Sequence, residues 1–445
     1  MKTRNYIEDN VDQMTKDLID FIGIPSVIDE MDSNKPFGEA IDRALKWVLN
    51  QFEAIGFKTY YDPEGYYGYA DYGEGREMLG ILTHVDVVPG GIESHWTYGP
   101  FKGTLAGGRL YGRGVLDDKG PIVSVLYAMK ALIAMEVPFN KRLRIIIGTD
   151  EENQWRGIYR YLKREEKPDF GFTPDASFPV QFAEKGLLQV RLKSTSKTDV
   201  RIKGGYAMNS IPESCVYHGN HIYKLEKQLK KMGFDHEIEG EELYVIGKSA
   251  HSSKPQMGVN AVMRMAMAAY DIGIESPILS FLYDKIGFTF HGETMFGKCV
   301  DAYSGDLTVS VNQLDMGAHG GVIGLDIRIP VTIDKKFIAE GIKRTAQKYG
   351  LVYDELDFLP PVFLPDTHPM IQTLRAVYEE ETNLDGTPIS SGGATYARAL
   401  DNTVAFGPLF PGMPKLVHQA DEYMDVKAFV KCTQIYAKAI ERLVL

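Results

Sequence analysis

The sequence predicts an α/β protein: a mostly parallel sheet with helices on both faces, and an α+β domain inserted into that chain. Three observations predict this fold class. Apolar runs such as LGILTHV and LRIIIG alternate with helical patterns, as buried parallel strands do. After Glu184 the pattern changes to the alternating strands of a half-exposed sheet. A proline-rich stretch, FLPPVFLPDTHP, then precedes a last region that we expect to rejoin the first domain.

The first domain begins with alternating helix and strand patterns. Pro121 suits the first turn of a helix, because the N–H that proline lacks would have no partner there. RLRIIIGTDEE is typical of a buried strand that ends in acids. The expected elements are an amphipathic helical start over 6–22, a helix over 40–52, a strand over 78–88, a helix over 121–135 and a strand over 142–152.

The inserted domain is expected from the strands LLQVRLKS, ELYVIGKS, DLTVSVNQL and GVIGLDIRIP, with helices over 260–273 and 334–350. We place it at 185–365, so that 1–184 and 366–445 form the first domain. The final helix follows Asp425, whose side chain can cap the first turn. Its expected inner stripe is Phe429, Cys432, Tyr436, Ile440 and Leu443.

Composition excludes several classes of partner. The 445 residues carry a net charge of −11, from 60 acidic and 49 basic side chains, which disfavours nucleic-acid binding. The N-terminus MKTRNYIEDNVDQ lacks the apolar region of a signal peptide, and no apolar run reaches membrane-spanning length. The three scattered cysteines make neither a C-x-x-C motif nor a disulfide framework. We therefore expect a cytoplasmic protein without nucleic-acid or membrane partners.

His84 and Asp86 lie near the carboxyl end of the strand expected over 78–88, just before a turn. Residues two apart in a strand point the same way, so both side chains would face one site. In that arrangement His84 can bind a metal while Asp86 accepts the far N–H of its imidazole and fixes its tautomer. The plain structural alternative is that both residues cap the strand and bind water.

Further acidic and imidazole side chains follow strands or precede helices. Open α/β sheets bind ligands at the carboxyl ends of their strands. Each residue alone also has a structural explanation, such as helix capping or solvation. The residues are Asp117, Asp118, Asp150, Glu151, Glu152, Asp175 and His418.

Together these residue types suit a site for two metals. Two histidines and three carboxylates can hold two divalent ions if one carboxylate bridges them. Three carboxylates and a hydroxide also balance the charge of two such ions. Glu151 and Glu152 are adjacent, so in an extended chain they point to opposite sides. One can then bind a metal while the other takes a proton.

Five motifs, THVDVVP, GRGVLDDKGP, GTDEEN, GKSAHSSKPQMGVNA and SSGGATYAR, resemble in this order those of the co-catalytic zinc peptidases. That family includes carnosinases, aminoacylases, bacterial glutamate carboxypeptidases and succinyl-diaminopimelate desuccinylase. The resemblance covers nearly the whole chain and is greatest to the bacterial dipeptidases of the PepV type. It implies a catalytic dinuclear-metal domain, and a lid formed by the inserted domain.

The resemblance also implies roles for residues of the first domain. The implied ligands are His84 and Asp175 for one metal, Glu152 and His418 for the other, and Asp117 as the bridge between them. The bridge would be joined to Asp118 by a cis peptide. Glu151 would be the general base, and Asp86 would remain the residue that orients the imidazole.

In the second domain, His251 resembles the family histidine that reaches the scissile carbonyl oxygen. The glycines and the threonine of SSGGATYAR would bind the substrate's C-terminal carboxylate. The implied substrate contacts are Asn209, Arg328, Gly392, Gly393 and Thr395. Such residues also occur in plain turns.

The resemblance predicts a metallopeptidase that hydrolyses dipeptides with a free N-terminus. One alternative is an amidohydrolase of the same family, acting on N-acyl amino acids or succinyl-diaminopimelate; another is a non-catalytic metal- or peptide-binding protein, although the base Glu151 is present. The absence of G-x-S-x-G and H-E-x-x-H disfavours other hydrolases.

Two divalent ions are expected per subunit, with Zn²⁺ ahead of Mn²⁺ or Co²⁺. The expected partner is a small peptide. The large insertion predicts a monomer in which His251 acts within its own subunit, with a dimer as the alternative.

Overall fold

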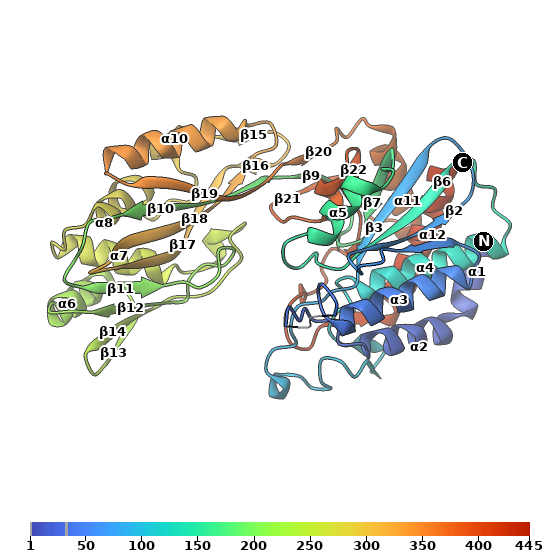
Figure 1. The fold of residues 1–445 in the computed structure, drawn as a ribbon, viewed down its shortest axis with the longest axis horizontal. Coiled ribbons are helices and arrows are strands. Elements are labelled where there is room, and N and C mark those ends of the chain that lie inside the picture. Colours follow the sequence, from blue (N-terminus) through green and yellow to red (C-terminus); the bar gives the residue numbers. More distant parts are fainter. Residues whose placement is uncertain (1, 32–33) are drawn as a thin grey trace. The chain divides into compact units, whose positions relative to one another are not determined.

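The computed structural model describes residues 2–31 and 34–445 and contains two compact units, drawn in Figure 1. Unit 1 holds the chain up to Phe182, then Leu364–Ile389 and Thr395–Leu445, and unit 2 holds Ala183–Phe363 and Ser390–Ala394. The domain boundaries expected at 184/185 and 365/366 each lie two residues from a division between these units. We did not expect residues 390–394 to join the second unit, and a lid role for that unit stays a prediction.

The sheet of unit 1 has a parallel centre. Its strand order is β1-β2-β6-β3-β7-β22-β9, in which β6, β3, β7 and β22 are parallel neighbours. The β1–β2 hairpin pairs antiparallel with β6, and β9 pairs antiparallel with β22. The strands are β1 (Lys58–Tyr61), β2 (Gly68–Tyr72), β3 (Met78–His84), β6 (Arg142–Gly148), β7 (Phe170–Thr173), β9 (Gln181–Glu184) and β22 (Thr403–Ala405). The strand expected over 78–88 therefore ends at His84.

Helices cover both faces of this sheet. Phe172 of β7 pairs with Ile81 of β3, whereas Arg144 of β6 pairs with Gly80, the neighbouring residue of β3. Phe172 and Arg144 therefore point to opposite faces. The ring of Phe172 stacks on Tyr436 of helix α12 (Val426–Val444), and the Arg144 guanidinium donates to the hydroxyl of Tyr161 of helix α5 (Arg156–Arg164). The sheet is thus buried between helices, as its apolar strands require.

The helices of unit 1 largely match the expected segments. They are α1 (Lys2–Asp9), α2 (Val11–Ile22), α3 (Glu39–Glu53), α4 (Lys119–Ala134), α5 (Arg156–Arg164), α11 (Pro369–Thr382) and α12 (Val426–Val444). The helical start expected over 6–22 is two helices, because Asn10 leaves helical geometry (φ −108°, ψ 12°). The predicted inner stripe of α12 is buried. Asp425, however, accepts a hydrogen bond from Arg109 Nε rather than capping α12 with its side chain.

Unit 2 is built on an eight-stranded antiparallel sheet of order β13-β14-β12-β11-β17-β18-β10-β19. Helix α7 packs against β11, β12, β14 and β17 of this sheet, and their aliphatic side chains form the core. The strands are β10 (Gly186–Ser194), β11 (Arg201–Gly204), β12 (Ser214–His218), β13 (His236–Glu239), β14 (Glu242–Ile246), β17 (Thr308–Gly317), β18 (Gly320–Ile329) and β19 (Val352–Leu359). The helices are α6 (Ile222–Met232), α7 (Ala261–Asp271), α8 (Pro277–Phe281), α9 (Glu293–Phe296) and α10 (Lys335–Lys348).

The predicted fold class is confirmed, because a parallel sheet covered on both faces and an antiparallel α+β unit occur in one chain. In the part of the chain that the structure describes, no helix is both long and apolar enough to span a membrane.

Candidate metal centre

Three neighbouring strands of unit 1 end in acidic or imidazole side chains. His84 is the last residue of β3, Glu151 and Glu152 follow β6, and Asp175 follows β7. Because β6, β3 and β7 are parallel neighbours, their carboxyl ends meet at one edge of the sheet. The backbone topology therefore gathers these four residues.

Asp117 and His418 lie on loops that a small sheet of order β24-β5-β4 holds together. Its strands are β4 (Thr104–Ala106), β5 (Arg109–Tyr111) and β24 (Tyr423–Asp425). Strand β5 precedes Asp117 and β24 follows His418, so their antiparallel pairing joins the two loops. The Glu422 carboxylate strengthens this junction. It accepts hydrogen bonds from Arg113 Nη1 at 2.6 Å and from the Leu116 backbone N–H at 2.9 Å.

Two groups of possible metal ligands share Asp117, and within each group the ligand atoms lie within 4.8 Å of one another. The groups are His84, Asp117 and Asp175, and Asp117, Glu152 and His418. One Asp117 oxygen lies 2.9 Å from His84 Nε2, and the other lies 3.1 Å from His418 Nε2. A carboxylate whose two oxygens face different imidazoles is placed as a bridging ligand would be. The cis peptide expected between Asp117 and Asp118 is present.

The tautomer of His84 tests whether a cation fits the first group. His84 Nδ1 lies 2.9 Å from the Asp86 carbonyl oxygen. A carbonyl can only accept, so Nδ1 carries the hydrogen, and the neutral ring has its lone pair on Nε2. Nε2 faces an Asp117 oxygen at 2.9 Å, and among the described residues neither of these buried atoms has a hydrogen-bond partner. Two buried electron-pair donors that converge in this way fit a shared divalent cation.

The charges of the cluster point the same way. Burial, together with the nearby Asp117 carboxylate, raises the pKa of Asp175 to about 7. His418 is an exposed side chain whose partial desolvation would lower its pKa, but its bonds to Asp117 and Glu152 outweigh this and raise the pKa to about 11. Burial likewise raises the pKa of Glu152, with a further contribution from Asp117. Buried carboxylates that disfavour ionisation need positive charge close by, and divalent cations would supply it.

Asp86 contacts His84 through its backbone carbonyl, not through its carboxylate as expected, and its carboxylate binds the turn that carries Glu151 and Glu152. We expected its carboxylate to accept the far N–H of His84. Because β3 ends at His84, the two residues do not alternate on a strand, and that N–H donates to the Asp86 backbone carbonyl. The nearest carboxylate oxygen is 3.4 Å away. The carboxylate accepts the backbone N–H groups of Glu151 at 3.1 Å and Glu152 at 3.0 Å. Asp86 thus holds both the imidazole and the turn that carries the two glutamates.

Glu151 lies beside the cluster, and neither ligand group contains it. Its neighbour Glu152 has a carboxylate oxygen 3.0 Å from His418 Nε2. Burial raises the pKa of Glu151 well above the usual range for a glutamate, and the negative charge of Asp175 adds to this rise. A carboxylate with a raised pKa beside a metal site has the properties of a general base or acid near neutral pH. The adjacent glutamates therefore differ in environment, although they lie in a turn rather than in the extended chain that the sequence suggested.

Unit 2 holds the predicted substrate residues His251 and Asn209 on adjoining turns. An isolated β-bridge joins Ser210 to His251, and the Ser252 backbone N–H donates to the Asn209 carbonyl at 3.0 Å. His251 Nδ1 lies 2.7 Å from Ser253 Oγ. Both His251 and Asn209 are exposed, which suits residues that bind a ligand.

Arg328, also in unit 2, supports the glycine loop. Its Nη1 donates to the Gly392 carbonyl at 2.7 Å, and its guanidinium forms a buried bidentate pair with Asp326. A Cβ added to Gly392 would lie 2.7 Å from Ser253 Cβ, so this loop passes close to the His251 turn. The structure thus gathers Arg328, Gly392 and the His251 turn within unit 2.

The remaining predicted contacts have local partners. The Gly393 backbone N–H donates to Ser391 Oγ at 3.0 Å in unit 2. Thr395, the first residue of its segment in unit 1, accepts the Ala397 backbone N–H at 3.2 Å and so caps a short 3₁₀ helix. For Thr395 this contact supports the structural role in a turn, and a substrate contact stays a prediction.

Sequence reasoning missed several residues that support the site. A Cβ added to Gly148, at the end of β6, would lie 2.4 Å from the Tyr396 hydroxyl, so the tyrosine ring fills this space. Arg113 and Glu422 form the buried pair beside the ligand loops, and Asp326 pairs with the predicted Arg328. Arg113 and Tyr396 lie in two of the five quoted motifs, GRGVLDDKGP and SSGGATYAR. The available signal was the position of a charged or aromatic side chain within a motif whose other residues were expected to be buried.

The chain matches known proteins along almost its whole length. A protein from Bacillus subtilis (strain 168), named "Putative dipeptidase YtjP", is 35% identical over 456 residues, with 97% of each chain covered. A Staphylococcus aureus (strain USA300) protein, "Putative dipeptidase SAUSA300_1697", is 31% identical over 458 residues, again with 97% of each covered.

Solved structures share the fold at low identity. Human carnosine dipeptidase 1 matches with a TM-score of 0.64 at 14% identity, covering 100% of this chain and 98% of that one. The dipeptidase Dug1p from Saccharomyces cerevisiae matches with a TM-score of 0.63 at 15% identity, covering 99% and 97%. The model of peptidase family M20/M25/M40 matches residues 80–442. This chain therefore belongs to peptidase family M20/M25/M40, and the peptidase relationship that its five ordered motifs predicted is confirmed.

Proposed function

We propose that this protein is a metal-dependent dipeptidase whose reaction uses Glu151 as the general base. The observation that carries the proposal is the pair of ligand groups that share Asp117, with a half-buried glutamate beside them that belongs to neither group. The relatives named dipeptidases, which match 97% of this chain, support a dipeptide substrate.

The proposed ligands are His84 and Asp175 for one ion, Glu152 and His418 for the other, with Asp117 between them. Asp86 is proposed to hold His84 in the tautomer that leaves Nε2 unprotonated, through the contact of its backbone carbonyl with Nδ1. Two divalent ions, when bound, acidify water and withdraw electrons from a carbonyl oxygen. We propose Zn²⁺, with Mn²⁺ or Co²⁺ as alternatives, because all three suit imidazole and carboxylate ligands.

Glu151 is proposed to take a proton from the attacking water and to give it to the leaving amine. Its raised pKa places the carboxylate nearer to neutral pH, where a base can both accept and return a proton. Asp86 fixes the Glu151 and Glu152 backbone N–H groups, so it holds the base and the ligand in a constant relation.

In unit 2, His251 is proposed to stabilise the negative charge that develops on the carbonyl oxygen. Asn209 and the backbone N–H groups of Gly392 and Gly393 are proposed to bind the substrate, and Arg328 to hold the glycine loop through the Gly392 carbonyl. Thr395 is proposed to add a hydroxyl contact. The free amine of a dipeptide distinguishes this substrate from the N-acylated substrates of the amidohydrolase alternative.

A substrate and metal screen tests the proposal. Metal-stripped protein would receive Zn²⁺, Mn²⁺ or Co²⁺ separately and then be offered free dipeptides, N-acetyl amino acids and N-succinyl-diaminopimelate. We expect hydrolysis of free dipeptides with at least one metal, and none without metal. Hydrolysis confined to the acylated compounds would replace the dipeptidase proposal by the amidohydrolase.

We also propose that the protein is monomeric and cytoplasmic and that His251 acts within its own subunit. Mixing inactive His251→Ala protein with inactive Glu151→Gln protein tests the subunit assignment. We expect no recovery of activity and a monomer mass by light scattering. Recovery would mean that the histidine acts on a partner subunit.

A further inference from the structure

Asn312 lies at an irregularity in the sheet of unit 2. The register between β17 and β18 shifts between Val311 and Gln313, so Asn312 is the extra residue of a β-bulge. Val309 and Val311 face the core before the bulge, and Leu314 does so after it. A bulge redirects a side chain that regular pairing would commit to one face of the sheet. Here it redirects a fully buried amide.

The Asn312 amide donates to two different turns. Its Nδ2 donates to the Met208 carbonyl and, at 2.6 Å, to Ser252 Oγ. The orientation of the amide follows from the chemistry, because the Met208 carbonyl can only accept. Met208 immediately precedes Asn209, and Ser252 immediately follows His251. One buried side chain therefore holds the neighbours of both exposed residues that are proposed to meet substrate.

The surrounding backbone leaves the amide little freedom. A Cβ added to Gly205 would lie 1.8 Å from the Asn312 carbonyl oxygen, so only glycine lets the chain before Met208 pass this close. The positive φ of Gly205, 76°, also favours glycine. Gln313 Nε2 then donates to the Tyr206 carbonyl at 2.9 Å. The Asn209 turn is thus tied to β17 at successive positions.

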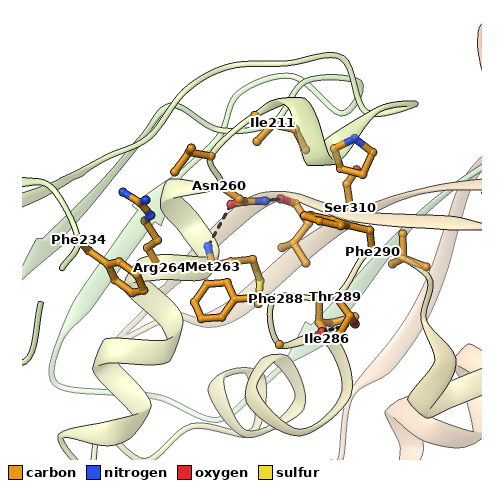
Figure 2. Close-up of a pocket in the computed structure, with 16 residues that line it drawn as sticks. Ile211, Phe234, Asn260, Met263, Arg264, Ile286, Phe288, Thr289, Phe290 and Ser310 are labelled. Atoms are coloured by element: carbon orange, nitrogen blue, oxygen red, sulfur yellow. Dashed lines mark hydrogen bonds between the residues drawn. The ribbon is translucent and has the colours of Figure 1, made fainter. Parts of the chain in front are cut away.

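The segment that carries His251 is tied to β17 a second time, at its far end. The Asn260 side chain accepts the Met263 backbone N–H at 3.0 Å, a bond drawn in Figure 2, and donates to the Val311 carbonyl at 2.7 Å. These contacts border an apolar pocket of about 240 Å³ that Ser310 also lines. The Asn260 contacts therefore hold this end of the segment where it borders the pocket.

We propose that Asn312 is a positioning residue that sets His251 and Asn209 in their working arrangement through its two N–H donors. This inference rests on the proposed function, in which those two residues act on the substrate. A displaced catalytic group can reduce a rate about 10²-fold even when every reacting side chain is present. The amide acts through its neighbours and touches neither substrate nor metal.

Kinetics of Asn312→Ala test the proposal, with Ser310→Ala as the matched control. Ser310 lies on the same strand and is similarly buried, but its hydroxyl has no hydrogen-bond partner among the described residues. We expect Asn312→Ala to lower kcat about 10- to 100-fold with a smaller change in KM, and Ser310→Ala to stay within about 3-fold of wild type. Ser252→Ala keeps the Met208 contact and should show a smaller loss than Asn312→Ala.

A double-mutant cycle separates positioning from general structural damage. If Asn312 acts through His251 and Asn209, then Asn312→Ala should lower the residual single-turnover rate by less than about 3-fold in a His251→Ala, Asn209→Ala background, because both groups that it positions are gone. An equal cost in both backgrounds, or a loss in Asn312→Ala matched by Ser310→Ala, would overturn the proposal.

Histidine NMR of the metal-free protein supplies a readout that needs no activity. The ring signal of His251, assigned by its loss in His251→Ala, should shift or broaden in Asn312→Ala and stay unchanged in Ser310→Ala. An unchanged signal in Asn312→Ala would overturn the positioning role. If the wild-type protein hydrolyses none of the offered substrates, the proposed function fails, while the NMR comparison still decides whether Asn312 positions His251.

Discussion

Asp86 in unit 1 and Asp301 in unit 2 each use a carboxylate to hold a turn, yet their surroundings differ. Asp86 accepts two backbone N–H groups beside a cluster of other carboxylates, of which Asp117 is buried and Glu152 and Asp175 are half-buried. Asp301 accepts the N–H and O–H groups of Ser304 and Thr332, which are neutral. Both turns are therefore held by a carboxylate that accepts N–H groups. In unit 1 this carboxylate is also repelled by its negatively charged neighbours, whereas in unit 2 the groups that contact it are neutral. We therefore expect bound cations to stabilise the unit 1 turn, and the unit 2 turn to be stable without them.

The largest effect is expected at Glu151, the proposed general base, which lies on the turn that Asp86 holds. Glu151→Gln should reduce kcat by at least about 10²-fold, because glutamine cannot accept a proton from water at neutral pH. The metal content should stay at the wild-type value, since Glu151 belongs to neither ligand group. Steady-state kinetics and elemental analysis of the same preparation measure both quantities.

Glu152→Gln is the matched control for this prediction, because it changes the neighbouring residue of the same turn. It should lower metal content, since Glu152 lies 3.0 Å from His418 Nε2 in the second ligand group. If Glu151→Gln remained active while Glu152→Gln lost only activity and kept its metal, the two glutamates would have the reverse roles.

Removal of metal should distinguish the two units. A ligand at about 100 times its dissociation constant stabilises the state that binds it by about 2.7 kcal/mol, so a chelator should destabilise unit 1 by about this amount. The backbone N–H groups of Glu151 and Glu152 should exchange with solvent faster in the metal-free protein. The N–H groups of Ser304 and Thr332 in unit 2 should keep their rates. Hydrogen exchange before and after chelation, with metal added back, measures both; equal acceleration in the two units would contradict the comparison.

The sequence predicted the fold and the unit 1 cluster well for a physical reason. Apolar strands and amphipathic helices carry periodic patterns, and parallel strands must end at a common edge of the sheet. His84, Glu152 and Asp175 could therefore be grouped from their places after strands. The metal-ligand roles assigned to single residues came from the motif resemblance and stay predictions. Local geometry was less accessible, since the break at Asn10 and the end of β3 at His84 have no periodic signal.

Unit 2 was harder to derive, because its turns depend on single side-chain contacts. Asp326 and Asn312 read as ordinary polar residues of alternating strands. For Asn312 a signal was present: the apolar positions of DLTVSVNQLDM occur at odd numbers up to Val311 and at even numbers from Leu314. Because alternation in a strand has a period of two, such a slip indicates a bulge. The slip would have located the bulge, although not the partners of the redirected amide.

The smallest predicted effect is a pH dependence of unit 2 that Asp301 produces. Burial would raise the pKa of Asp301, but hydrogen bonds from Ser304 and Thr332 outweigh burial and lower it below the ordinary value of 3.8. The folded state therefore binds fewer protons than the unfolded state, so the stabilisation is fully present above pH 3.8 and is lost as the pH falls through the lowered pKa. Asp301→Asn should cost about 1.5 kcal/mol near neutral pH, the lower end for hydrogen bonds to a charged group. Urea unfolding of metal-free wild type and variant, compared at about pH 6 and about pH 3, should show this difference shrinking in acid as the wild-type carboxylate is protonated. A difference that stayed constant between the two pH values would mean that the charge of Asp301 contributes nothing, and that the turn is held equally well by a neutral acceptor.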